Sequence, residues 1–181
     1  AKGVPELLEA VRLLRGQGLD ASLELYGGGT ELESLRSRAR ELGLAEGAAD
    51  FCGRTPNAQV LARMRQADLV VVPSRHSYPE GLPNVIYEAL EMRTPAVLSD
   101  HPSFTGRLRD GAGVVFFRAG SAADLAAKVK AAADPAAFAA LSRETEAGWQ
   151  AIQCPLTFAE VVGDWAGAVA EGRAPRCLAH G

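Results

Sequence analysis

Residues 73–88 read PSRHSYPEGLPNVIYE and contain an expected loop followed by the start of an expected helix. Directly before it, the apolar run DLVVV (68–72) is typical of a strand buried on both faces of a parallel sheet, so we expect this strand to lie mid-sheet. Residues 73–82 then form a loop. A helix is expected to begin near Pro83 and to end near Met92, because proline suits the first turn of a helix.

Two glutamates flank the expected start of this helix, Glu80 on the loop and Glu88 on the helix. The free amides of a helix's first turn bind anions such as phosphate, with about half a positive charge behind them. Glu88 is placed to chelate vicinal hydroxyls such as those of ribose, and Glu80 those of a sugar. Either glutamate alone is also typical of an acid that complements a helix dipole or of a solvated loop acid. Together they favour a nucleotide-sugar site.

Strands and helices alternate on both sides of this unit. Strands are expected at 21–26, 50–52, 68–72, 95–99 and 113–117. Helices are expected over 5–15, 30–42, 56–66, 83–92, 103–109 and 157–171, with two more beginning at Ser121 and Asp134. This alternation predicts an α/β fold, namely a Rossmann-like, doubly wound parallel sheet with right-handed crossovers and helices on both faces.

Three of the expected helices begin with capping signals. Thr30 and Glu33 match a capping box, and Ser121 with Asp124 matches an N-cap. Asp134 precedes a proline, which is the favoured order at a helix start. We therefore expect side chains to cap all three helices.

The composition limits the class of protein. The 181 residues suit one domain, expected over 1–171, with a loose tail over 172–181. Hydrophobic residues make up 48%, which excludes a disordered chain, and the net charge of −3 offers no basic surface to a nucleic acid. No apolar run approaches the roughly 20 residues of a membrane span. Cys52, Cys154 and Cys177 lack metal or redox spacing, so reduced thiols in the cytoplasm are expected.

Ligands of a parallel sheet bind beyond the carboxyl ends of its strands, which directs attention to three further loops, 27–30, 53–56 and 99–102. The first contains three glycines, which allow close approach of the backbone to a ligand. In the last, His101 is interpreted as a residue that hydrogen-bonds within the loop and not as a catalyst.

These motifs resemble the C-terminal, donor-binding domain of the retaining glycosyltransferases of family 4, which have the GT-B architecture. About 170 residues take part in the resemblance, and the block with the paired glutamates is its most specific motif. The matching residues are Lys2-Gly3-Val4, the glycine turn, Phe51-Cys52-Gly53, Ala67-Asp68, Pro73-Ser74, Glu80 to Asn84, Glu88-Ala89-Leu90, Thr94 to Val97 and Asp110-Gly111.

The resemblance implies a role for each site residue. Glu80 would be the catalytic residue that binds the donor-sugar hydroxyls, and Glu88 would bind the ribose. Lys2 would neutralise the pyrophosphate, and Arg54 and Thr55 would lie near the base. The expected donor-binding residues are Lys2, Gly28, Gly29, Arg54, Thr55, Gly81, Leu82, Pro83, Asn84, Val85 and Glu88. No metal site and no cofactor are expected beyond the nucleoside-diphosphate sugar itself.

The implied activity is transfer of a hexose from a nucleoside-diphosphate sugar to an acceptor, with retained anomeric configuration and without a metal. The chain departs from the family pattern at three points: a preceding strand with an arginine is missing, Arg93 replaces a glycine, and the N-terminal acceptor domain is absent. We therefore expect the full-length parent protein to be a cytoplasmic, bacterial enzyme and this chain to be inactive by itself. Any association with a membrane would come only through the parent protein.

Other functions remain open on the residues alone. A nucleotide-sugar epimerase of GT-B architecture and a non-catalytic nucleotide-binding module are the alternatives. A sugar phosphorylase would need a cofactor lysine, and the chain has only Lys2, Lys128 and Lys130. A response-regulator-type signalling domain would need an acidic cluster after the first strand and a lysine after the last, and the sequence has neither.

Overall fold

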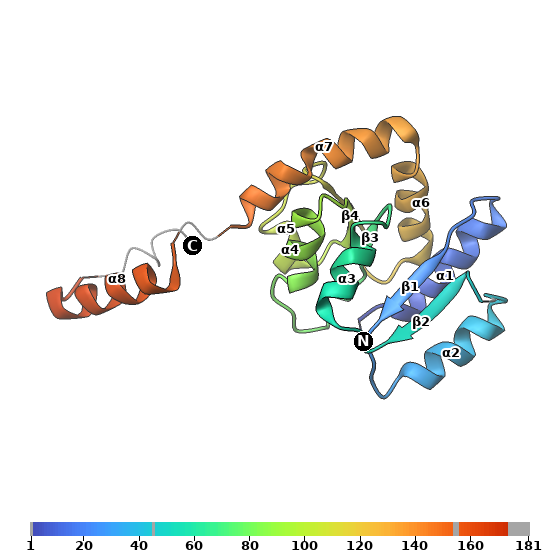
Figure 1. The fold of residues 1–181 in the computed structure, drawn as a ribbon, viewed down its shortest axis with the longest axis horizontal. Helices are drawn as coiled ribbons and strands as arrows, with labels where there is room; N and C mark the ends of the chain where they lie inside the picture. The colour runs from blue at the N-terminus through green and yellow to red at the C-terminus, as the bar shows by residue number, and fades with distance from the viewer. Residues whose placement is uncertain (1, 45, 154–155, 174–181) are drawn as a thin grey trace.

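The computed structural model describes residues 2–44, 46–153 and 156–173 of the chain (Figure 1). The strands are β1 (Leu23–Tyr26), β2 (Ala49–Gly53), β3 (Val70–Val72), β4 (Ala96–Ser99) and β5 (Val114–Phe117). The helices are α1 (Val4–Gly16), α2 (Leu32–Glu41), α3 (Asn57–Met64), α4 (Asn84–Glu91), α5 (Pro102–Thr105), α6 (Ala122–Ala132), α7 (Pro135–Ala151) and α8 (Phe158–Glu171). Strands and helices alternate up to α6, as the sequence predicts.

All strand pairs are parallel, which confirms the α/β class, but the strands form two hydrogen-bonded sheets. In the first, β1 pairs with β2, and Leu23 lies opposite Ala49. In the second, the order is β3-β4-β5, and Ala96 of β4 lies between Val70 and Val114. Among the described residues no ladder joins β1 to β3, so the expected single five-stranded sheet is divided at this point.

Among the described strands, the central position expected for 68–72 is not found. β3 is an edge strand, and β4 is the central strand of its sheet, with all four residues buried. The apolar composition of β3 has a different cause, because helices cover both of its faces: Val72 packs with the core under α4, and Val71 packs with the core under α1.

Helices cover both faces of the three-stranded sheet, as predicted. On one face α1 and α6 pack against Val97 and Phe117. On the other face α4 and α5 pack against Leu98 and Val114. Helix α1 also packs with α2 against the two-stranded sheet, so α1 is the element that connects the two sheets through apolar contacts.

Two of the three expected caps are confirmed. The Ser121 hydroxyl accepts a hydrogen bond from the Asp124 amide (3.2 Å), and the Asp134 carboxylate accepts from the amides of Ala136 (3.0 Å) and Ala137 (3.1 Å). These bonds fix the first turns of α6 and α7.

The capping box expected at Thr30 is wrong. Helix α2 begins at Leu32, its N-cap is Glu31, and no side chain caps it. The reason is a tight turn, in which the Leu32 amide donates to the Gly29 carbonyl (3.2 Å) and which includes Thr30. The sequence pattern did not show that this turn would move the N-cap by one residue, from Thr30 to Glu31.

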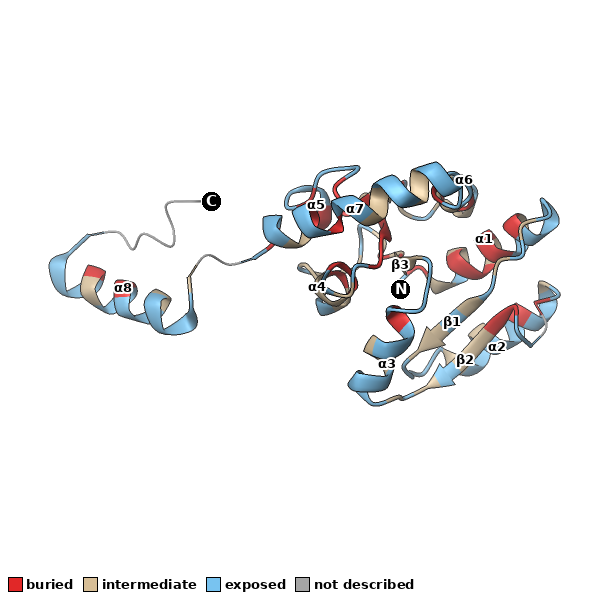
Figure 2. Cartoon of the chain, turned by 45° about the horizontal axis from the view of Figure 1, so that its top comes forward, coloured by how far each residue is buried: buried red, intermediate tan, exposed pale blue. Residues whose placement is uncertain are grey.

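Helix α8 stands apart from the remainder of the described chain (Figures 1 and 2). A capping box formed by Thr157 and Glu160 begins it. Its side chains Phe158, Val162, Trp165 and Val169 are exposed, Phe158 by 85%. Of the expected tail 172–181, residues 174–181 lie outside the described residues.

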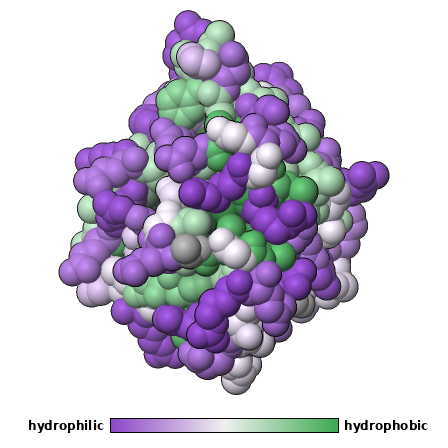
Figure 3. Space-filling view, turned by 90° about the vertical axis from the view of Figure 1, so that its right-hand side faces the viewer, coloured by the Kyte–Doolittle hydropathy of each residue, from purple (hydrophilic) through white to green (hydrophobic). Residues whose placement is uncertain are grey.

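The remaining surface features are consistent with the composition. On the face that lies at the right-hand side of Figure 1, hydrophilic side chains surround a central area that contains hydrophobic ones (Figure 3). None of the helices in the described ranges is both long and apolar enough to cross a membrane. Cys52 is a free, exposed thiol, and Cys154 and Cys177 lie outside the described residues.

Candidate functional site

The loop between β3 and α4 holds Glu80 as predicted, and its carboxylate has two partners. One carboxylate oxygen accepts a hydrogen bond from the hydroxyl of Ser74, the second residue after β3. The other lies 3.6 Å from the ammonium nitrogen of Lys2, and the Glu80 side chain is only 11% exposed. Lys2 also lies over the ring of Tyr78, 5.2 Å from its centroid. Lys2, Ser74, Tyr78 and Glu80 therefore form one cluster at the carboxyl end of β3.

The position of Lys2 depends on a close backbone contact. Gly3 has φ 76°, and a Cβ atom there would lie 1.9 Å from the Pro73 carbonyl oxygen. Any side chain at this position would thus push the start of α1 away from β3. Glycine allows the two backbones to meet, and this contact brings Lys2 to the Glu80 loop.

The start of α4 lies close to the predicted position. Pro83 is the N-cap, Asn84 is the first helical residue, and no side chain caps the helix. The amides of its first turn are therefore not occupied by a cap, and the helix dipole adds a partial positive charge at the same point.

Glu88 projects from α4 toward α3. Its carboxylate oxygen accepts a hydrogen bond from the side-chain amide of Asn57 (3.3 Å), the first residue of α3. Sequence reasoning did not select Asn57. The only feature of the sequence that points to Asn57 is its place in the segment after β2, two residues beyond Thr55, which was expected near the base.

The residues expected near the base follow β1 and β2. Gly28 lies beside Arg54, since a Cβ atom at residue 28 would be 3.8 Å from the Arg54 Cγ atom. The Thr55 hydroxyl is within 3.5 Å of the Cys52 carbonyl oxygen. Gly29 is exposed, and its carbonyl oxygen accepts the hydrogen bond of the Leu32 amide in the turn before α2.

The structure thus forms separate pairs from the predicted residues. It joins Lys2 to Glu80 and Gly28 to Arg54, and it joins Glu88 to the unpredicted Asn57. Among the described residues, no hydrogen bond or ion pair joins Lys2 to the start of α4. Gly81 and Leu82 line a cavity of about 320 Å³ together with Tyr87, Ser103 and Arg107.

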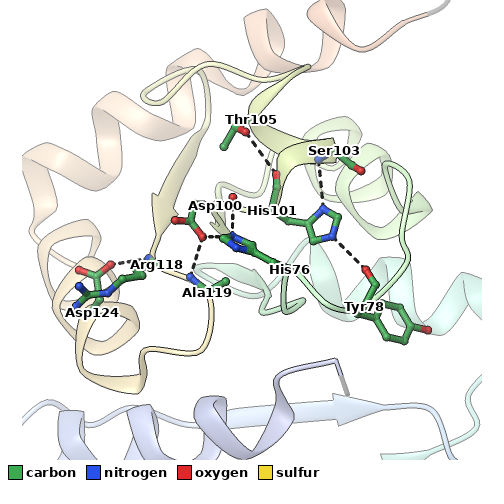
Figure 4. Close-up of polar contacts among 9 residues, drawn as sticks. All are labelled: His76, Tyr78, Asp100, His101, Ser103, Thr105, Arg118, Ala119 and Asp124. Atoms are coloured by element: carbon green, nitrogen blue, oxygen red, sulfur yellow. Dashed lines mark hydrogen bonds and ion pairs between the residues drawn. The ribbon is translucent and has the colours of Figure 1, made fainter.

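The segment after β4 contributes contacts that sequence reasoning missed (Figure 4). Asp100 accepts from the ring of His76 (2.7 Å) and from the amide of Ala119 (2.8 Å). Burial alone would raise the pKa of Asp100, but these two hydrogen bonds outweigh it and hold that pKa below its ordinary value. His101 is buried and bonds within the loops, as predicted.

Comparison with known proteins defines the family. The sequence profile of the family described as "Glycosyl transferases group 1" matches residues 1–139. The chain therefore belongs to the glycosyl transferases group 1 family.

A curated relative and two solved structures add detail. Phosphatidyl-myo-inositol mannosyltransferase of Mycobacterium leprae (strain TN) is 37% identical over 125 residues, which are 69% of this chain and 32% of that protein. Sucrose-phosphate synthase from Thermosynechococcus elongatus has a TM-score of 0.78 at 23% identity, covering 94% of this chain and 43% of that chain. Anabaena HepE, solved with UDP-glucose, has a TM-score of 0.68 at 23% identity, and the match covers 81% of this chain and 40% of that chain.

These likenesses establish the fold and a length relation. The chain has the fold of the part of each solved structure that it matches, 40% of HepE and 43% of sucrose-phosphate synthase. The chain spans about a third of the length of the curated relatives that it matches, 30% in one case and 32% in the other.

Proposed function

We propose that this chain is the nucleotide-sugar-binding, C-terminal domain of a retaining glycosyltransferase of family 4. The observation that carries the proposal is the placement of two carboxylates at one uncapped helix start. Glu80 lies before α4 and Glu88 lies within it, at the edge of the sheet where ligands of parallel α/β folds bind.

Each part of the donor has a suitable group in this arrangement. The first-turn amides of α4, from Asn84 and Val85, suit the distal phosphate. The Glu88 carboxylate suits the ribose hydroxyls, and the Glu80 carboxylate suits the hydroxyls of the sugar, because a charged acceptor strengthens such hydrogen bonds. Lys2 would then offset the charge of the leaving pyrophosphate, which is the task that a metal ion performs in other transferases.

The relatives support this choice of ligand. HepE is solved with UDP and with UDP-glucose, and the curated relative is a mannosyltransferase. We infer that the parent of this chain moves a hexose from a nucleoside-diphosphate sugar, retains its configuration and needs no metal. The acceptor would bind to an N-terminal domain of the same parent protein.

The division between the two sheets also supports a domain that forms part of a larger protein. The edges of β1 and β3 are unpaired in the described residues, and both strands pack on α1. A further parallel strand between them would complete one continuous sheet, with α1 as its crossover helix. This fits the preceding strand that the resemblance implies.

Calorimetric titration of the purified chain tests the proposal. We expect UDP, GDP or ADP, or the matching nucleotide sugar, to bind with a dissociation constant between about 1 mM and 1 µM. The monophosphate of the same base should bind more weakly, because it lacks the distal phosphate. No heat from any of these ligands at millimolar concentration, with a folded chain, would reject the proposal.

A further inference from the structure

The loop that carries Glu80 is held by the segment after β4 at alternate residues. Asp100 contacts His76 (2.7 Å), His101 contacts Tyr78 (3.1 Å), and Ser103 contacts Glu80 (2.7 Å). Figure 4 shows the first two of these contacts, with His76 and His101 side by side between the two segments. Three of the four residues 100–103 therefore meet loop residues 76, 78 and 80 in matching order.

The chemistry of each contact determines its donor. The Nε2 atom of His76 lies within hydrogen-bond distance of two acceptors, the carboxylate and the carbonyl oxygen of Asp100, so Nε2 carries the proton. The Nε2 atom of His101 faces the Tyr78 carbonyl and its Nδ1 atom accepts from the Ser103 amide, which fixes a neutral ring protonated at Nε2. The Ser103 hydroxyl donates to the backbone carbonyl of Glu80.

The segment 100–103 is itself anchored to the sheet. The Asp100 amide donates to the Phe117 carbonyl of β5 (2.8 Å), and the Asp100 carboxylate accepts from the Ala119 amide. The next residue, Phe104, is fully buried in the core. A segment tied to both β5 and the core is a rigid support, whereas the Glu80 loop has no regular structure of its own.

We propose that Asp100, His101 and Ser103 are positioning residues that set the place of the Glu80 carboxylate and thereby the recognition of the donor's sugar. This inference rests on the proposed function. Ser103 acts most directly, because its hydroxyl holds the backbone of the residue whose side chain would bind the sugar. The nucleotide half of the donor, assigned to Glu88 and α4, should not depend on these contacts.

Two hydroxyls on α5 provide a matched pair of variants. Ser103→Ala removes the bond to Glu80 and leaves the Ser103 amide, which bonds to His101, in place. Thr105→Ala removes a hydroxyl of the same helix that reaches only the carbonyl of His101 (3.5 Å). Ser103→Thr keeps the hydroxyl, and the neighbouring cavity has room for the added methyl group.

The first measurement is calorimetric titration with UDP and UDP-glucose. We expect Ser103→Ala to weaken the binding of UDP-glucose about fivefold, which is the usual effect of losing one hydrogen bond. The affinity for UDP should change by less than about twofold. Thr105→Ala should change neither affinity, and Ser103→Thr should restore UDP-glucose binding. Equal weakening of both ligands in Ser103→Ala would overturn the assignment to sugar recognition.

The second measurement needs no ligand and separates this inference from the proposed function. Hydrogen–deuterium exchange of the backbone over 74–82 should become faster in Ser103→Ala and in Asp100→Ala, and should not change in Thr105→Ala. Unchanged exchange in the first two variants would overturn the positioning role even if UDP-glucose binds. Faster exchange together with no nucleotide binding by the unmodified chain would reject the proposed function and uphold the support of the loop.

Discussion

Arg93 is the residue whose conformation departs most from its type. It follows the end of α4 with φ 64°, in the left-handed region where glycine is usual. The Arg93 amide bonds to the Leu90 carbonyl (3.1 Å), and the Thr94 amide bonds to the Ala89 carbonyl (2.9 Å), which together form a Schellman motif. The side chain forms an ion pair with Glu146 of α7, but both partners are about half exposed.

Arg93→Gly should therefore be more stable than Arg93→Ala by about 1 kcal/mol, because only glycine adopts this φ without a steric cost. Both variants lose the ion pair, which is worth less than about 1 kcal/mol at the surface, so their comparison isolates the backbone term. Urea denaturation midpoints measure the difference. Equal midpoints would show that Arg93 carries no strain.

The residues of the site were predictable to different degrees. Glu80 and Glu88 are defined by their spacing around a helix start, which is local information. Asn57 and Ser103, which bond to Glu88 and Glu80, and Asp100, which bonds to the Glu80 loop, come from other elements, and only the folded sheet brings them near. Sequence reasoning identified the glutamates for that reason and missed the residues that hold them.

Gly148 shows how one residue sets the packing of an element. It lies in the last turn of α7, and a Cβ atom there would be 2.2 Å from the Ala112 carbonyl oxygen before β5. The absence of a side chain allows α7 to lie directly on this backbone.

Gly148→Ala should lower the free energy of unfolding by about 1–3 kcal/mol, because overpacking outweighs the helix propensity that alanine gains. Gly16→Ala, at the end of α1 with no atom within 4 Å of its Cβ position, is the control and should be neutral or stabilising by up to about 1 kcal/mol. Denaturant titration of both variants provides the test. The same gain in both would mean that α7 does not rest on Ala112.

At the scale of elements, local signals predicted most of the fold. Helix α7 begins at Pro135 because the Asp134 side chain caps it, and this signal is visible in the sequence. The position of β3 in its sheet was not visible, because a strand covered on both faces by helices has the same apolar composition at an edge as in the centre. Strand order depends on pairing between distant segments, which composition does not encode.

The described part of the chain consists of a packed α/β body and the separate helix α8. The exposed apolar side chains of α8 recur at 158, 162, 165 and 169, which places them on one face of the helix. Within α8 only Asp164 and Ala168 are buried. The body therefore gains little stability from this helix.

A chain that ends at Gln153 should unfold at the same temperature as the full chain, within about 2 °C. The reason is that the deletion removes little buried apolar surface while Ile152, which packs in the core, is kept. Differential scanning calorimetry measures the transition. A fall of more than about 4 °C would show that α8 or the residues around it support the body.

In the proposed function, one helix start separates two binding tasks, with Glu88 for the nucleotide and Glu80 for the sugar. Calorimetric titration of Glu88→Gln and Glu80→Gln with UDP and with UDP-glucose tests this division. Both substitutions keep the shape of the side chain and remove its charge. Thermal unfolding of each variant checks that the fold is intact.

Glu88→Gln should weaken the binding of UDP about ten- to hundredfold, as expected for the loss of a charged hydrogen-bond acceptor worth about 1.5–3 kcal/mol. Glu80→Gln should change the affinity for UDP by less than about twofold. It should weaken the binding of UDP-glucose by a factor similar to the one by which Glu88→Gln weakens the binding of UDP. Equal loss of UDP affinity in both variants would contradict the division of roles. No loss in either variant would show that the two glutamates are a helix-start acid and a loop acid without a ligand.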